Sequence, residues 1–168
     1  TSIGASTFAD ATNLATITGL NGVTSVGSNA FSNSKISSLT FGSALANIAS
    51  SAFVGANNLS SITLNTNSRV VVGDSAFSGL SNLSSLTNSS AITSIGSNAF
   101  ANTSITTFNA NNLTKIGDSA FANATKLSNF TGASNKLTSI GANAFSGATQ
   151  ITTLDLSNVT NLSGTSLA

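Results

Sequence analysis

Side chains able to perform acid–base or metal chemistry are few in this sequence. Four aspartates supply all of its carboxylate side chains, and the chain has no Glu, His or Cys. Imidazole bases, thiolate nucleophiles and the usual zinc ligands are therefore missing. Asp74 and Asp118 occupy the same place in two copies of the motif GDSAF, where each is expected to cap a short helical turn. We expect a protein that is not an enzyme, has no cofactor or metal site and takes no small-molecule substrate.

The charged residues also argue against nucleic acid as a partner. A nucleic-acid binder relies on clustered cations that displace counterions from phosphates. Here the net charge is +1, and the five cations are scattered along the chain: Lys35, Arg69, Lys115, Lys126 and Lys136. The sequence also lacks an apolar run near 18 residues, so we expect no membrane insertion.

A short motif ending in Ala-Phe recurs along the whole chain, for example SIGSNAF at 94–100 and SIGANAF at 139–145. Its phenylalanines are 21 to 24 residues apart: Phe8, Phe31, Phe53, Phe77, Phe100, Phe121 and Phe145. A degenerate eighth copy, LSGTSL, occupies 162–167. We call each copy a Phe box. Because the period is regular, it indicates repeat units rather than a disordered Ser/Thr-rich stalk.

Two further apolar residues, three apart, lie between successive Phe boxes, for example Leu59 and Ile62. One repeat cannot enclose its apolar residues, whereas stacked repeats share a continuous core. The pattern predicts a repeat solenoid: a right-handed coil with one parallel β-strand per repeat of about 23 residues, mostly strand and loop with short helical turns. We expect one domain, 1–168, of seven to eight coils, whose two ends both fall within a repeat.

The Phe boxes predict two details of the coil. Each phenylalanine should rest on the ring one coil away and so form a buried spine. The glycine after the first apolar residue of most boxes, such as Gly73 and Gly96, should adopt positive φ in a turn. Asp74 and Asp118 lie two coils apart, so they are too distant to share a metal.

The segment LSSLTNSSAITSIGSNAFANTSITTF (83–108) resembles the BspA-like class of leucine-rich repeats, and the resemblance extends over essentially the whole chain. It implies a curved parallel β-solenoid from a bacterial or protist surface or secreted protein, most often one that adheres to host or matrix proteins or to other cells. The chain departs from the family in having no Cys after the Phe and no Pro after the strand.

In each predicted strand the residues that flank the central apolar one should point outward, since side chains alternate. They form two columns, which we call the strand face: Thr16 and Thr18, Ser38 and Thr40, Ser61 and Thr63, Ser85 and Thr87, Thr107 and Asn109, Asn129 and Thr131, Thr153 and Asp155. One interpretation is an ordinary solvated β-surface. The other is a docking surface of an extracellular or cell-surface module for adhesion or protein binding. Alternatives are a surface filament that assembles end to end and ice binding through the Thr ladders.

Overall fold

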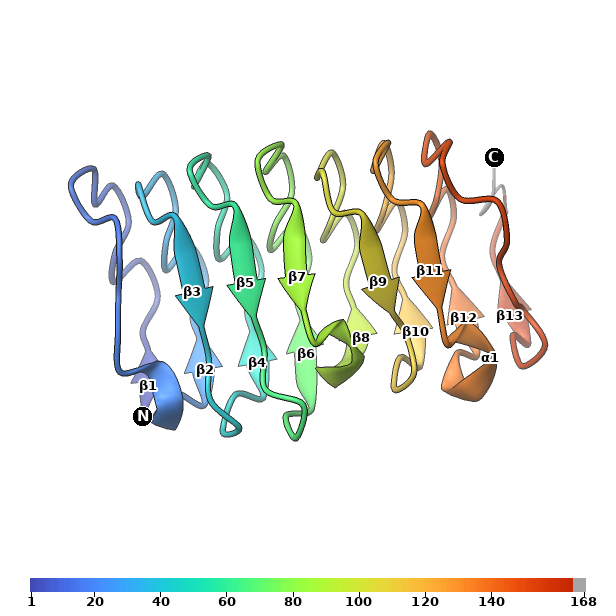
Figure 1. Ribbon diagram of the computed structural model, residues 1–168, viewed down its shortest axis with the longest axis horizontal. Helices are drawn as coiled ribbons and strands as arrows, with labels where there is room; N and C mark the ends of the chain where they lie inside the picture. Colours follow the sequence, from blue (N-terminus) through green and yellow to red (C-terminus); the bar gives the residue numbers. More distant parts are fainter. Residues whose placement is uncertain (165–168) are drawn as a thin grey trace.

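The chain winds into about seven coils stacked in single file, with the first and the last described residues at opposite ends of the stack (Figure 1). This computed structural model describes residues 1–164. Each coil takes up one repeat of about 23 residues, and strands of neighbouring coils pair in parallel. The predicted solenoid is therefore confirmed. The second half of the eighth, degenerate Phe box, 165–167, lies outside the described residues.

One side of the stack is an eight-stranded parallel sheet, built from the segments at the start of the Phe boxes. Its strands, in spatial order, are β1 (Ser2–Ile3), β2 (Ser25–Val26), β4 (Asn47–Ile48), β6 (Val70–Val72), β8 (Ile92–Ile95), β10 (Lys115–Ile116), β12 (Ser139–Ile140) and β13 (Asn161–Leu162). Each strand pairs with the strand one coil away, and a register shift between Val70 and Val71 interrupts the β6–β8 pair.

The strands predicted from the sequence form the other side, which lies in front in Figure 1. They are β3 (Ser38–Thr40), β5 (Ser61–Thr63), β7 (Ser85–Thr87), β9 (Thr107–Asn109) and β11 (Asn129–Thr131). In the first coil Thr16 makes an isolated bridge to Ser38, and residues 153–155 form no strand. The sequence predicted one strand per coil. In five of the described coils the structure has two, one on each side of the core.

The phenylalanine spine is confirmed. Successive box phenylalanines stack with ring centroids 5.0 to 5.5 Å apart, from Phe8 through Phe145. Phe77, for example, lies 5.0 Å from Phe53 and 5.1 Å from Phe100 and is almost fully buried. The rings belong to one continuous apolar core that extends along the stack.

The box glycines have a different role from the predicted one, because Gly73 and Gly117 do not have positive φ. A Cβ on Gly73 would lie 2.6 Å from the backbone nitrogen of Ser50, one coil away, and a Cβ on Gly117 would lie 2.6 Å from that of Ser97. Glycine is required here because adjacent coils approach too closely for any side chain.

Left-handed backbone conformations flank each box phenylalanine instead. Two residues before the Phe, φ lies between 53° and 58° at Ser6, Asn29, Ser51, Ser75, Asn98, Ser119 and Asn143. Two residues after it, φ is positive at Asp10, Asn33, Gly55, Gly79, Asn102, Asn123 and Gly147. Gly, Asn and Asp tolerate this region best, so the polar residues beside the Phe are part of the turn.

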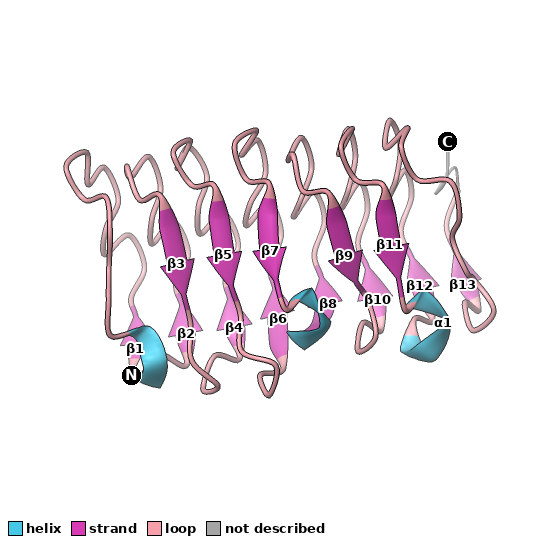
Figure 2. Cartoon of the chain, in the orientation of Figure 1, coloured by secondary structure: helices cyan, strands magenta, loops and turns pink. Residues whose placement is uncertain are grey.

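Three helical turns occur in the described residues: η1 (Leu20–Gly22), η2 (Ser89–Ala91) and α1 (Ala133–Lys136). Each follows a residue in the left-handed conformation, namely Gly19, Asn88 or Gly132. Figure 2 shows all three at the edge where the front segments end. None of the described helices is long and apolar enough to cross a membrane.

Candidate functional site

The strand face is the most regular exposed surface of the molecule. In β3, β7, β9 and β11 the central side chain is buried, while both flanking side chains are exposed. In β5 the flanking Ser61 and Thr63 are half-buried. The pairing aligns Ser38 with Ser61 and Ser85, and Thr40 with Thr63 and Thr87. The structure thus aligns the predicted columns through three coils and again from β9 to β11, where Thr107 lies opposite Asn129.

The Ser and Thr hydroxyl groups of the strand face make no hydrogen bond to residues 1–164. Neighbouring ladder positions behave differently, because their hydroxyls donate to the carbonyl one coil away. Ser60 Oγ donates to the Ser37 carbonyl at 3.2 Å, and Ser37 Oγ donates to the Ala15 carbonyl at 3.1 Å. Hydroxyls beside the strand face therefore hold the coils together, whereas those on it are left to solvent or a partner.

Two predicted face residues are engaged within the chain. Asn109 Oδ1 accepts a hydrogen bond from the Asn111 backbone N–H at 3.0 Å. Asp155 Oδ1 accepts one from the Ser157 backbone N–H at 2.9 Å and is also bonded to the Ser157 hydroxyl. Both form short local turns, so they are less available to a partner than the Ser and Thr side chains.

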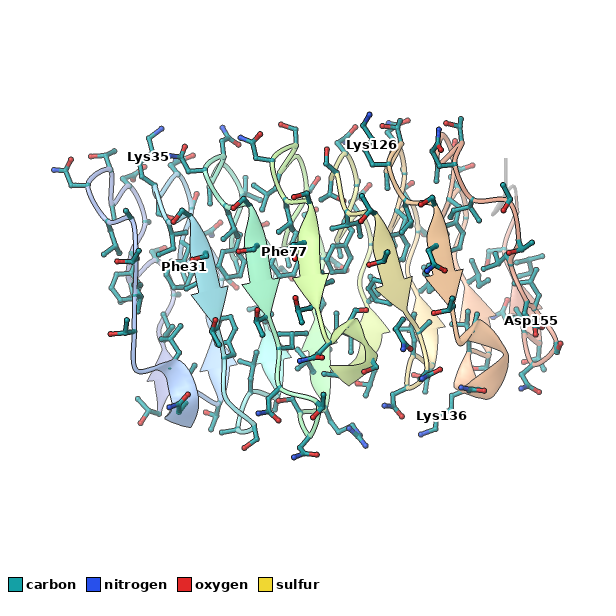
Figure 3. The ribbon with its side chains drawn as sticks, in the orientation of Figure 1. Phe31, Lys35, Phe77, Lys126, Lys136 and Asp155 are labelled. Carbon is teal, nitrogen blue, oxygen red and sulfur yellow. The ribbon has the colours of Figure 1, made fainter. Side chains whose placement is uncertain are left out.

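Charged side chains lie around the strand face rather than on its continuous part. Figure 3 places Lys35 and Lys126 on the turns at one edge of the strands and Lys136 at the other edge. Lys136 Nζ donates to Asn112 Oδ1 at 2.9 Å, which ties two coils together. The strands β3, β5, β7, β9 and β11 contain no charged residue.

Asp74 and Asp118 do not cap helical turns, contrary to the prediction. Asp74 Oδ1 accepts a hydrogen bond from the Ser97 backbone N–H at 2.7 Å, and Asp118 Oδ1 accepts one from Ala142 at 2.8 Å. Each bond joins a coil to the next. Both carboxylates therefore act in coil stacking.

The strand face is interrupted between β7 and β9, which belong to separate sheets. After β3 and β5 the chain stays extended, and the backbone N–H of Phe41 still donates to Thr63 in the next coil. After β7, Asn88 turns the chain into η2. Ser89 then points inward, and its Oγ accepts from the Asn109 backbone N–H at 2.7 Å and donates to the Asn109 carbonyl at 3.4 Å.

This interruption leaves a groove of about 580 Å³, which we call the second groove. Its lining includes Ser85, Thr87, Asn88, Ser89, Thr107 and Asn109. A similar first groove of about 350 Å³ lies where the first coil meets β3, beside η1. Its lining includes Thr16, Thr18, Gly19, Asn21, Ser38 and Thr40.

The sequence analysis missed Gly19, Asn88 and Ser89, although a signal for them is present. Gly19 and Asn88 directly follow a strand-face Thr, at the place where β3 and β5 are followed by the buried Phe41 and Leu64. Gly and Asn favour the left-handed region, whereas a buried apolar residue continues the strand.

Comparison with known proteins agrees with this architecture. The model of the BspA type leucine rich repeat region matches residues 1–71 and 67–167, with six copies. No curated protein matches the chain.

Two solved structures are similar to the chain. A leucine rich cell surface protein from Faecalibacterium prausnitzii A2-165 is 18% identical, with a TM-score of 0.52 over 96% of this chain and 56% of that one. A leucine-rich repeat protein from Bacteroides ovatus ATCC 8483 is 16% identical, with a TM-score of 0.45 over 71% of this chain and 41% of that one. The chain thus spans about half the length of these proteins. Because the family model matches nearly all of its residues, the chain belongs to the BspA-type leucine-rich repeat family.

Proposed function

We propose that this chain is a non-catalytic binding module of an extracellular or cell-surface protein, and that its strand face docks on another extracellular or cell-surface protein. One observation carries the proposal: within residues 1–164 the strand-face Ser and Thr hydroxyls have no hydrogen-bond partner, while the hydroxyls of Ser37 and Ser60 beside them bond to the neighbouring coil. A free hydroxyl both donates and accepts hydrogen bonds, so ranks of them suit many weak polar contacts to a protein surface.

The lack of charge on the continuous part of this face supports binding by shape and neutral hydrogen bonds. The residue inventory, with no Glu, His or Cys, supports a role without catalysis. Membership of the BspA-type leucine-rich repeat family supports a role in binding.

The proposal is tested with lysine substitutions on the strand face. Thr63→Lys combined with Thr87→Lys places two charges on the ladder, and we expect capture of proteins from matrix and cell-surface extracts to fall at least tenfold. The matched control is Asn47→Lys with Ser139→Lys on the eight-stranded sheet, where Lys115 already occupies the same column. Equal capture by both double variants would show that partners do not dock on the strand face.

The other two hypotheses lead to different measurements. Ice binding needs a long, regular rank of Thr, which the interruption between β7 and β9 disfavours. A thermal-hysteresis gap no larger than that of a control protein would exclude it. End-to-end assembly into a filament predicts large species in sedimentation at high concentration, and a monomer under those conditions would count against it.

A further inference from the structure

The two grooves lie at the two ends of the continuous ladder β3–β5–β7. The first groove lies between the first coil and β3, and the second begins between β7 and β9 and extends to Asn129 and Thr131 of β11. The distance from the first groove to the part of the second that adjoins β7 is therefore three coils. Parallel strands in a sheet are spaced by about 4.7–4.9 Å, so three coil spacings amount to about 14 Å. The spine gives a similar repeat, since the rings of Phe31, Phe53 and Phe77 are 5.0 Å apart at each step.

Both grooves and the ladder between them share one chemistry. The ladder presents the hydroxyls of two aligned rows, Ser38, Ser61 and Ser85, and Thr40, Thr63 and Thr87. The linings of the grooves contain Ser, Thr and Asn side chains and no charged residue. A charged ligand group would lose hydration here without gaining an opposite charge, so this surface favours a neutral ligand with both donors and acceptors.

We propose that an extended, uncharged segment of the partner protein crosses β3, β5 and β7 along the axis of the stack, with two polar side chains four residues apart seated in the two grooves. An extended chain rises about 3.2–3.4 Å per residue, and its alternate side chains point to the same side. Residues i and i+4 are therefore on one side and about 13–14 Å apart, which matches the groove separation. The inference rests on the proposed function, because both grooves are part of the strand face.

The grooves, of about 350 Å³ and about 580 Å³, both have room for a Ser, Thr, Asn or Gln side chain. Between the grooves, the backbone N–H and carbonyl groups of the segment face the two hydroxyl rows. These groups satisfy one another because every hydroxyl can donate or accept.

In the test, a phage-displayed library of random linear 12-residue peptides is selected for binding to the whole chain. Enriched peptides should have Ser, Thr, Asn or Gln at two positions four apart and no charged residue between them. Thr18→Val with Thr40→Val alters the first groove, and Thr87→Val with Thr107→Val alters the second, in each case nearly without a change of volume. Each pair of substitutions should lower the affinity for a selected synthetic peptide about tenfold, as expected for the loss of two modest hydrogen bonds.

The matched control is Thr66→Val with Thr125→Val, two exposed turn threonines outside both grooves, which should change peptide affinity less than twofold. Three results would overturn the inference: no enrichment, enriched peptides without the four-residue spacing, or sensitivity to one groove pair alone. Binding of neutral glycans that is lost in the groove variants, with no peptide selected, would also overturn it. The lysine test at Thr63 and Thr87 has a different readout, although Thr87 also lines the second groove. Capture of proteins from extracts reports whether proteins dock on the face at all, whereas peptide binding reports on the two grooves.

Discussion

Replacing Phe77 by Ala tests whether stacked rings hold the coils together. The Phe77 ring is almost fully buried and contacts a ring on each side, at 5.0 Å and 5.1 Å. Burial of a Phe side chain contributes about 1.5–3 kcal/mol, and each aromatic pair adds about 0.5–1.5 kcal/mol. We therefore expect Phe77→Ala to lower the free energy of unfolding by about 3–5 kcal/mol, which is typical of a buried Phe.

Phe8→Ala is the matched control, because Phe8 is half-buried and stacks on one ring, Phe31, at 5.1 Å. Phe8→Ala should lower the free energy of unfolding by about 1–2 kcal/mol, because partial burial and one aromatic pair are lost. Equilibrium unfolding in urea, followed by circular dichroism and by hydrogen exchange, gives both values and shows whether coils unfold separately. If Phe77→Ala costs no more than Phe8→Ala, the ring stack is not the main source of coil cohesion.

Three further predictions test individual contacts. Gly96→Ala should lower stability by about 1–3 kcal/mol, because its Cβ would lie 2.6 Å from the Asp74 backbone nitrogen; Gly22→Ala, with open space around it, should change the melting temperature little. The buried Ser34 hydroxyl has no partner in the described chain, so Ser34→Ala should raise stability by about 1 kcal/mol. Thr103→Val, at the same place in its repeat, should lower stability by about 1 kcal/mol through loss of the 2.8 Å bond to the Phe100 carbonyl, and similar urea midpoints for these two variants would contradict the reasoning. Ser89→Ala removes the hydroxyl that bonds the Asn109 N–H, so the Asn109 amide should exchange with solvent about tenfold faster, and an unchanged rate would refute that role.

Sequence reasoning located the outward columns well in the central coils and poorly at the ends. The strands at 38–40, 61–63 and 85–87 follow directly from an apolar residue between two polar ones. The same pattern at 16–18 and 153–155 gives one isolated bridge and no strand. A strand exists only where the neighbouring coil pairs with it, and the local pattern does not specify that neighbour.

The role of the box glycines shows the same limit. A glycine after an apolar residue is compatible with a turn at positive φ or with close backbone approach, and the sequence alone does not separate the two. Likewise, the carboxylate of Asp74 was expected within its own coil but bonds to Ser97 in the next. Contacts between coils involve residues 20 or more positions apart, so local motifs do not reveal them.

The sequence by itself determined the repeat, the ring spine and the identity of the residues in the two hydroxyl columns, because a regular apolar period can be buried only by stacking equivalent positions. Only the tertiary structure decided which hydroxyls form hydrogen bonds between coils. It also decided where the pairing of the front strands stops and grooves form. The physical reason is that hydrogen-bond partners and strand pairing depend on the spacing and direction of adjacent coils. One residue in the left-handed conformation, such as Asn88, is enough to redirect the chain and separate two strands.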